Sequence, residues 1–294
     1  MCDSILVSAK SRPDYTWQLA RRFRRIIMSD SNERKFSSAW LFFLLNFVWT
    51  WAFWIPAAFL SRDGSTPLIT ALHFIGGVGP MLAALVLLYS VKDKQVRRDF
   101  WRRVFDIKRI KGRWYLVIFL TYPLLTLLPA ALDILMNGAG IRPELASQFI
   151  QQPLMILPVT IFFLFFGPIP EELGWRGYAL DRLQTTRTAL VSSLILGAFW
   201  ASWHLPLFFI KGTYHNNLGV GTTAFYLFLI QPIIGSILYT WVYNNTNRSI
   251  LSAILFHFMG NYLGELFELS ERAEILQLMI TVLFVVIVVF IWGP

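Results

Sequence analysis

The chain has 294 residues, of which 56 % are hydrophobic and 15 % charged, and its formal net charge is +9. Soluble domains average about 45–50 % apolar and about 25 % charged residues, so this composition excludes a disordered chain and an ordinary water-soluble domain. The basic residues lie between long apolar runs, which argues against a nucleic-acid partner. We therefore predict an all-α, polytopic membrane helical bundle in contact with the lipid bilayer.

Eight apolar segments are candidates for membrane-spanning helices, since a bilayer core needs about 20 residues of helix. They cover roughly residues 38–60, 68–91, 114–136, 154–183, 189–210, 223–243, 250–264 and 273–292. The fourth is overlong and is interrupted by Gly167-Pro168-Ile169-Pro170, and the seventh is short and polar. Residues 1–36 are predicted to be a basic cytoplasmic tail, and residues 37–294 a single membrane domain.

Positive charge predicts the orientation of the spans, because loops rich in Lys and Arg stay in the cytoplasm. With the N-terminus in the cytoplasm, 22 of the 26 Lys and Arg residues lie on that side. This asymmetry predicts an integral, multi-pass protein with both termini cytoplasmic. We identify no targeting signal, and we expect a bacterial cytoplasmic membrane.

Two basic stretches also have apolar residues at helical spacing. Helices of this kind lie in the headgroup plane, where anionic lipid attracts their charges. The alternative is that both stretches are simply loops that set the topology. The apolar positions are Trp17, Ala20, Phe23 and Ile27 in the first stretch and Val96, Phe100, Val104 and Ile107 in the second.

The fourth segment carries ionisable residues, which within spans usually face the bundle interior or a water-filled cavity. Its sequence is Glu171-Glu172-Leu173-Gly174-Trp175-Arg176. Successive helical residues point about 100° apart, so the two carboxylates cannot serve one role equally. Glu172 and Arg176 are four residues apart and can pair, which leaves Glu171 free to meet other helices. The alternative is a helix end with routine charges.

The fifth and seventh segments supply the other polar groups. His257 and Asn261 are four residues apart and share one helix face, where they can donate to an oxyanion, bind a metal or bridge helices. His204 follows Trp200 by four residues in an aromatic run, and a lone membrane histidine is often a bridging donor. Jointly, a carboxylate, two histidines and an asparagine from three helices can activate a water and receive an oxyanion.

Other polar residues fit a catalytic site less well. Asp133 has no second aspartate placed to form a dyad, and Ser236 has no histidine at matched depth. His73 lies outside these motifs. His215, in Tyr214-His215-Asn216-Asn217, is predicted to be an external loop residue.

The three motifs resemble the signatures of the CAAX prenyl endopeptidase and bacteriocin-processing (Abi, CPBP) family of intramembrane proteases. The family pattern is Glu-Glu-x-x-x-Arg, then an aromatic-x-x-x-His, then His-x-x-x-Asn. Trp200 departs from the commoner Phe but keeps an aromatic ring, so altered packing is expected there. The motifs cover about residues 168–264 and stand here as Glu171-Glu172 with Arg176, Trp200 with His204, and His257 with Asn261.

The resemblance implies an endopeptidase that cleaves a membrane-associated peptide or protein, with a catalytic core at about residues 150–264. By family analogy, Glu171 with His204 activates the water, and His257 with Asn261 stabilises the oxyanion. Glu172 and Arg176 would support the site. The alternative function is a non-enzymatic membrane immunity or scaffold protein of the same fold, which binds a peptide or partner. A small transporter with a proton relay is a further alternative.

The resemblance leaves the cofactor open. Glu171, His204 and His257 are a set that can hold a divalent metal such as zinc, with an open position for water. A metal-free glutamate mechanism is equally compatible with the same residues. No His-Glu-x-x-His motif is present, which argues against a zinc protease of the site-2 type.

One geometric condition applies to this site. On straight helices with a rise of about 1.5 Å per residue, Glu171 lies in the cytoplasmic third of the membrane and His204 roughly 20 Å from the inner end of its helix. The two side chains can meet only through tilt, a kink at Gly167-Pro168, or a shifted span boundary. We expect one of these three.

Overall fold

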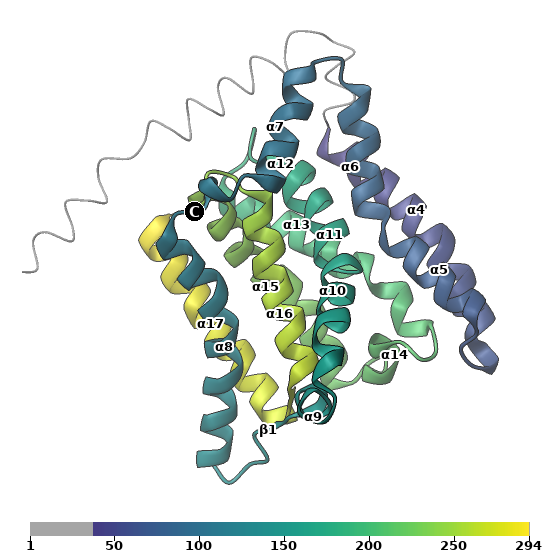
Figure 1. Cartoon of the computed structure of the whole chain (residues 1–294), viewed down its shortest axis with the longest axis vertical. Coiled ribbons are helices and arrows are strands. Elements are labelled where there is room, and N and C mark those ends of the chain that lie inside the picture. Colours follow the sequence, from purple (N-terminus) through teal and green to yellow (C-terminus); the bar gives the residue numbers. More distant parts are fainter. Residues whose placement is uncertain (1–37, 294) are drawn as a thin grey trace, which may run out of the picture.

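The structure is a computed structural model that describes residues 38–293, and it is helical almost throughout (Figure 1). Six helical segments of this part are long and apolar enough to cross a membrane, or seven if the bent pair α5 (Pro67–Gly77) and α6 (Gly79–Ser90) is one span. The prediction of a polytopic helical bundle is confirmed. Eight spans is an approximate count, because α16 (Ile250–Leu266) is apolar but shorter than the others.

Most of the remaining helices lie within the predicted segments or the second amphipathic stretch, but those at Glu144–Gln151 and Tyr214–Leu218 lie outside both. Eight helices in the described part are preceded by a Ser, Thr or Asp whose side chain accepts a hydrogen bond from a backbone N–H of the first turn. Residues of these types are the preferred N-caps, so they mark where these helices begin. In chain order, the helices other than α5, α6 and α16 are α4 (Ala39–Leu60), α7 (Lys94–Phe105), α8 (Gly112–Leu135), α9 (Glu144–Gln151), α10 (Ile156–Phe165), α11 (Pro168–Gly174), α12 (Asp181–Leu183), α13 (Ala189–Trp203), α14 (Tyr214–Leu218), α15 (Thr223–Asn245) and α17 (Glu271–Trp292).

Short elements connect these helices. A π-helical turn, η4 (Trp175–Leu180), joins α11 to α12, and a 3-10 turn, η5 (Leu205–Phe209), follows α13. The other 3-10 turns are η1 (Ser61–Asp63), η2 (Ile107–Arg109) and η3 (Pro153–Met155). Strands β1 (Ile141–Arg142) and β2 (Glu268–Leu269) pair antiparallel, with Ile141 opposite Leu269.

The second predicted span is broken at Val78, where α5 and α6 meet at 42°. The break frees backbone carbonyls, which must find donors inside a membrane. Trp54 Nε1 donates to the His73 carbonyl at 2.7 Å, and Thr50 Oγ1 donates to the Gly76 carbonyl at 2.9 Å. Glycine is required at position 76, because a Cβ there would lie 2.3 Å from the Trp54 ring. Helix α4 therefore holds the broken span in place.

The outer faces of the bundle are apolar. Figure 1 shows α4, α5 and α6 along one side of the molecule and α8 beside α17 along the other, with α15 and α16 between them. Leu157, Leu124 and Phe290 expose 68, 63 and 89 % of their surfaces. Helix α10 buries none of its residues. Such apolar outer surfaces are the ones that face lipid in membrane bundles.

The second amphipathic stretch forms α7, as its spacing predicts. Val96, Phe100 and Val104 are buried, because this face packs on α6 and α16, whereas Ile107 is exposed. Protein therefore covers most of the apolar face that could have rested on lipid. The first stretch, at Trp17 to Ile27, lies outside the described residues.

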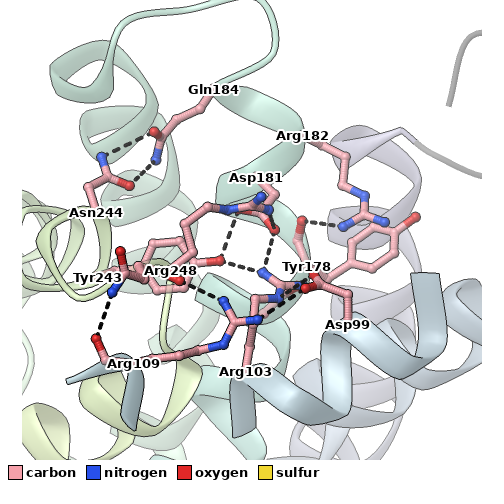
Figure 2. A network of polar contacts seen from close by, with 12 residues as sticks. Asp99, Arg103, Arg109, Tyr178, Asp181, Arg182, Gln184, Tyr243, Asn244 and Arg248 are labelled. Atoms are coloured by element: carbon pink, nitrogen blue, oxygen red, sulfur yellow. Dashed lines mark hydrogen bonds and ion pairs between the residues drawn. The ribbon is translucent and has the colours of Figure 1, made fainter. Parts of the chain in front are cut away.

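A polar network fastens α7 to the rest of the bundle (Figure 2). Arg103 Nη1 contacts Asp181 Oδ2 at 2.7 Å and donates to Tyr243 Oη at 2.6 Å. Tyr243 Oη donates to Asp181 Oδ1 at 2.9 Å, and Arg248 Nε donates to the same oxygen at 3.0 Å. Burial lowers the pKa of Arg103, but Tyr243 and Asp181 outweigh it and raise that pKa overall. The network joins α7, α12, α15 and the turn before α16.

At the opposite end of the molecule, a second group of polar contacts holds two helices together. Asp133, at the end of α8, accepts hydrogen bonds from Ser270 Oγ and from the Gly140 backbone N–H, each at 2.7 Å, and it pairs with Arg272. These contacts and the two strands hold the ends of α8 and α17 together. Asp133 is therefore engaged in holding helices, and it takes no part in a carboxylate dyad.

Candidate active site

The two glutamates lie on α11, directly after a break in the long fourth segment. Gly167 has non-helical backbone angles (φ −144°, ψ −86°), and Pro168 opens α11, where its missing N–H costs no hydrogen bond. The break stands where the sequence predicts a kink. Gly174 brings α11 against α6, because a Cβ there would lie 2.6 Å from Pro80. Both glutamates thus point into the bundle, and both are buried.

Glu172 is the centre of a buried ion cluster. Its Oε1 accepts hydrogen bonds from Arg176 Nη1 and from His257 Nδ1, each at 2.9 Å. The side chains of Glu172 and Arg176 are fully buried, and that of His257 is 4 % exposed. The ion pair expected from the four-residue spacing is present. A buried pair of this kind is stable only if each charge keeps its partner.

Arg176 is held on its other sides by α13 and α15. Its Nη2 donates to Ser236 Oγ at 3.2 Å, so the serine that the sequence analysis set aside as a nucleophile has an arginine as its partner. The Arg176 guanidinium also lies 4.6 Å from the Trp200 ring centroid and 4.3 Å from that of Tyr239. Contacts between a cation and aromatic faces gain strength when they are desolvated. Arg176 therefore fixes three helices around the two glutamates.

Glu171 has a different environment from its neighbour. Its Oε2 accepts hydrogen bonds from Trp200 Nε1 at 2.5 Å and from Trp175 Nε1 at 3.4 Å. Among the described residues, both of these donors bind Oε2, which leaves Oε1 available to a water. Trp175 follows Glu171 by four residues, a spacing that could have predicted the weaker contact. The contact from Trp200, 29 residues away, has no local signal.

His204 lies one turn beyond Trp200, at the end of α13. Its Nδ1 is 2.8 Å from the Trp200 carbonyl oxygen. A carbonyl oxygen only accepts, so we infer that Nδ1 carries the proton and that Nε2 of the neutral ring presents a lone pair. No direct hydrogen bond joins Glu171 to His204 within residues 38–293. They are linked through Trp200, which donates to Glu171 and lies 6.4 Å from the His204 ring.

His257 and Asn261 face the same segment from α16. The His257 ring lies 5.2 Å from the Trp200 ring, edge to face, and its Nδ1 reaches Glu172. Asn261 is exposed and lies beside the break before α11, since a Cβ on Gly167 would be 3.4 Å from Asn261 Nδ2. The structure thus brings His257 to Glu172 and Asn261 to the break before α11, whereas His204 reaches this group only through Trp200.

The prediction that His215 is an external loop residue is wrong. His215 is the second residue of α14 and is only partly exposed. Its ring stacks on the His204 ring, with the centroids 5.4 Å apart. The sequence has no periodic pattern here that would reveal this contact. It depends on how the connection between α13 and α15 folds back.

The donor set does not fit a metal ion. In the part of the chain that the structure describes, no three His, Cys, Asp or Glu side chains are placed to hold one. Glu172 Oε1 and His257 Nδ1 are engaged with each other, and Oε2 of Glu171 is engaged with two indoles. The metal set of Glu171, His204 and His257 is therefore not supported, and we derive no step through a metal.

A separate cavity of about 460 Å³ lies between α9, α10 and α16. The site residues are not among those that line it. Its walls are Glu144, Leu145, Gln148, Pro158, Val159, Phe162, Phe163 and Glu265.

The hydrogen bond from Trp200 to Glu171 leads to a prediction. The variant Trp200→Phe keeps an aromatic ring beside Arg176 and His257 but removes the indole donor. Hydrogen bonds to charged groups contribute about 1.5–3 kcal/mol, so we expect kcat to fall about ten-fold while KM stays unchanged. Steady-state kinetics of the endopeptidase activity that the family resemblance implies would measure this. A Trp200→Phe variant with unchanged kcat would show that the ring acts only by packing.

Comparison with known proteins finds relatives that share much of this chain's sequence. Residues 153–263 match the family model described as type II CAAX prenyl endopeptidase Rce1-like. The chain is 31 % identical over 239 residues to the CAAX prenyl protease 2 of Methanococcus maripaludis. That similarity covers 81 % of this chain and 88 % of the archaeon's protein.

Proposed function

This chain belongs to the type II CAAX prenyl endopeptidase family of membrane proteases, and from that premise we propose that it is an intramembrane endopeptidase that cleaves a membrane-associated peptide or protein. The observation that carries the proposal is the buried Glu171, whose Oε2 is fixed by two indoles while Oε1 stays available. A carboxylate held in one orientation at a polar site is suited to remove a proton from water.

The proposed reaction begins with a water at Glu171 Oε1. Glu171 takes one proton from it, with the Nε2 lone pair of His204 as the second acceptor of the water. The resulting hydroxide attacks the carbonyl carbon of the scissile peptide bond. The proton held by the site is then passed to the leaving nitrogen as the bond between carbon and nitrogen breaks. The first products are a carboxylic acid, which keeps the second proton of the water, and an amine; that proton then moves from the acid to the amine, which gives a carboxylate and an ammonium group and leaves the site restored.

The oxyanion of the tetrahedral intermediate would be received by His257 and Asn261. Because Nδ1–H of His257 is used on Glu172, Nε2 can donate only when the ring carries both protons. Because Glu171 then holds the proton of the water, the imidazolium and Arg176 would balance the charges of Glu172 and the oxyanion. Glu172 and Arg176 support this arrangement by holding His257 and the surrounding helices.

The protein is a multi-pass integral membrane protein, and we propose that both termini face the cytoplasm of a bacterial cell. Figure 1 shows α7 and the end of α17 at one end of the bundle and α9, α14 and the strands at the other. We assign the first end to the cytoplasm, because 22 of the 26 Lys and Arg residues belong to segments predicted there. The catalytic core is proposed to cover about residues 150–264.

Hydrolysis can be tested directly in liposomes that contain the purified protein and a lipid-anchored peptide. In water enriched in ¹⁸O, we expect one ¹⁸O atom in the new carboxyl group of the product, as detected by mass spectrometry. The alternative function, a non-enzymatic scaffold or immunity protein, predicts binding of the peptide without any cleavage. An intact peptide together with measurable binding would favour that alternative.

The same assay tests the metal-free mechanism. We expect the cleavage rate to stay unchanged after treatment with a chelator, because no acid or histidine set at the site is arranged as a metal centre. Metal analysis of the purified protein should give much less than one ion per chain. A rate that collapses on chelation and returns with zinc would contradict this mechanism.

A further inference from the structure

The four histidines of the chain lie along one connected path of aromatic rings. The His257 and His204 rings both contact Trp200, at 5.2 and 6.4 Å between centroids. His204 in turn stacks on His215. His73 reaches the same group through Trp54 and Trp203. The proposed mechanism uses only two of the four rings, and His215 is the unused one that touches a mechanistic residue directly.

The contact between His204 and His215 is close and well defined. The two rings are nearly parallel, at 23°, with centroids 5.4 Å apart. Phe228 of α15 packs edge-on against both rings, at 5.2 Å from His204 and 4.6 Å from His215. Phe208 adds a further edge contact to His215 at 5.4 Å. His215 thus forms part of the wall around His204.

The segment that carries His215 is fixed by its own hydrogen bonds. Thr213 Oγ1 caps α14 and donates to the carbonyls of Leu207 and Ile210, at 2.8 and 2.9 Å. Asn216 Nδ2 donates to the Phe208 carbonyl at 2.8 Å. Gly212 has φ +86°, a left-handed angle that only glycine adopts at little cost, and it turns the chain back toward α13. These contacts fix the turn and thereby position His215 next to His204.

One nitrogen of His215 lacks a partner. Its Nε2 is buried and makes no hydrogen bond within the described residues. A buried polar atom without a partner costs about 1–3 kcal/mol, so such atoms are rare unless a water or a ligand completes them. Burial, together with the nearby His204 and His73, lowers the pKa of His215 well below its ordinary value. The ring is thus neutral, with one nitrogen that donates and one that accepts.

We propose that His215 is a further substrate-binding residue of this active site, whose Nε2 forms a hydrogen bond with a backbone group of the bound peptide beside His204. The proposal rests on the proposed proteolytic function. A peptide presents both N–H and C=O groups, so either tautomer of the neutral ring has a partner. The ring would hold the peptide next to the residue that helps to activate the water.

The test compares two variants that separate the ring from its nitrogens. His215→Phe keeps the stack on His204 and the contact with Phe228 but removes both nitrogens. His215→Gln removes the ring but keeps a polar group that can reach the same position. Cleavage of the lipid-anchored peptide gives kcat and KM for each variant. Asn217→Ala is the matched control, because Asn217 is an exposed residue of the same short helix.

If the proposal is right, His215→Phe raises KM roughly ten-fold with little change in kcat, and His215→Gln recovers part of that loss. Asn217→Ala should match the wild type. A His215→Phe variant with the wild-type KM, or a His215→Gln variant no better than His215→Phe, would overturn the proposal. Melting temperatures in detergent check folding. If His215→Phe fails to fold, His215→Leu takes its place, judged by the same two criteria.

This inference can fail separately from the proposed function. A wild-type protein that binds the lipid-anchored peptide without cleaving it would refute the proposed function, and a Glu171→Gln variant that cleaves normally would refute only the role of Glu171 as the base. An inactive Glu171→Gln variant combined with a normal His215→Phe variant would refute only the role of His215.

Discussion

Glu171→Gln is expected to lower kcat at least about 10³-fold, within the range that a positioned general base contributes. The amide keeps the size of the side chain, and its oxygen can still accept the hydrogen bonds from Trp200 and Trp175. What the amide cannot do is take a proton from water. Peptide binding and folding should therefore survive, and the loss should lie in kcat. Single-turnover cleavage in liposomes measures the chemical step without product release.

A matched control for this variant is Glu271→Gln, which makes the same chemical change at an exposed position in the first turn of α17. It should cleave at the wild-type rate. If Glu171→Gln also cleaves at that rate, Glu171 is not the base. A variant that binds peptide but does not cleave it would also be suited to capture the natural substrate from membranes.

Arg176→Met should destabilise the protein by about 3–5 kcal/mol, the usual cost of removing one partner from a buried ion pair. Methionine has a similar length and no charge, so packing changes little. The variant leaves the fully buried Glu172 without its arginine partner. It also removes the hydrogen bond to Ser236 and the cation that lies over the two aromatic rings of the site. Unfolding in mixed micelles of detergent and SDS gives the free-energy change.

The double variant Glu172→Gln with Arg176→Met shows whether the lost charge is the cause. Removing the carboxylate as well should recover part of the stability, since neither charge is then left alone. Arg113→Met, at an exposed position at the start of α8, should stay within about 0.5 kcal/mol of the wild type. A single variant as stable as this control would contradict the role assigned to the cluster.

Much of the fold could be predicted, because local rules specify it. Hydrophobic length located the spans, and the four-residue spacings of Glu172 with Arg176 and of His257 with Asn261 placed each pair on one helix face. The break at Gly167 also followed from local chemistry. The break at Val78 was missed, because the α5–α6 region is apolar throughout, and its glycines serve contacts with Thr50 and Trp54 on α4.

The parts of the site that could not be predicted depend on contacts between distant segments. Trp200 was expected to alter packing only, yet its indole donates to Glu171 across 29 residues. His215 was assigned to an exterior loop, because polar neighbours usually indicate one. Its position follows from Gly212 and the Thr213 cap. Together they set the direction in which the chain turns back toward α13, and this direction is fixed only once the turn has folded.

The network around Asp181 also has a consequence for the order in which the protein assembles. Arg103 precedes Asp181 by 78 residues, and Arg248 follows it by 67. The earlier arginine is therefore made long before its acidic partner, and the ring of contacts can close only after α15 has entered the membrane. Arg103 can pair with Asp181 as soon as α12 is made, but until α15 and α16 follow, it lacks the Tyr243 hydroxyl and the buried face of α7 has no α16 to cover it. A chain that stops before residue 248 would keep the contacts of Arg103 with Asp181 and Tyr243, but it would lack Arg248, the second cation at Asp181, and α16, which covers the buried face of α7.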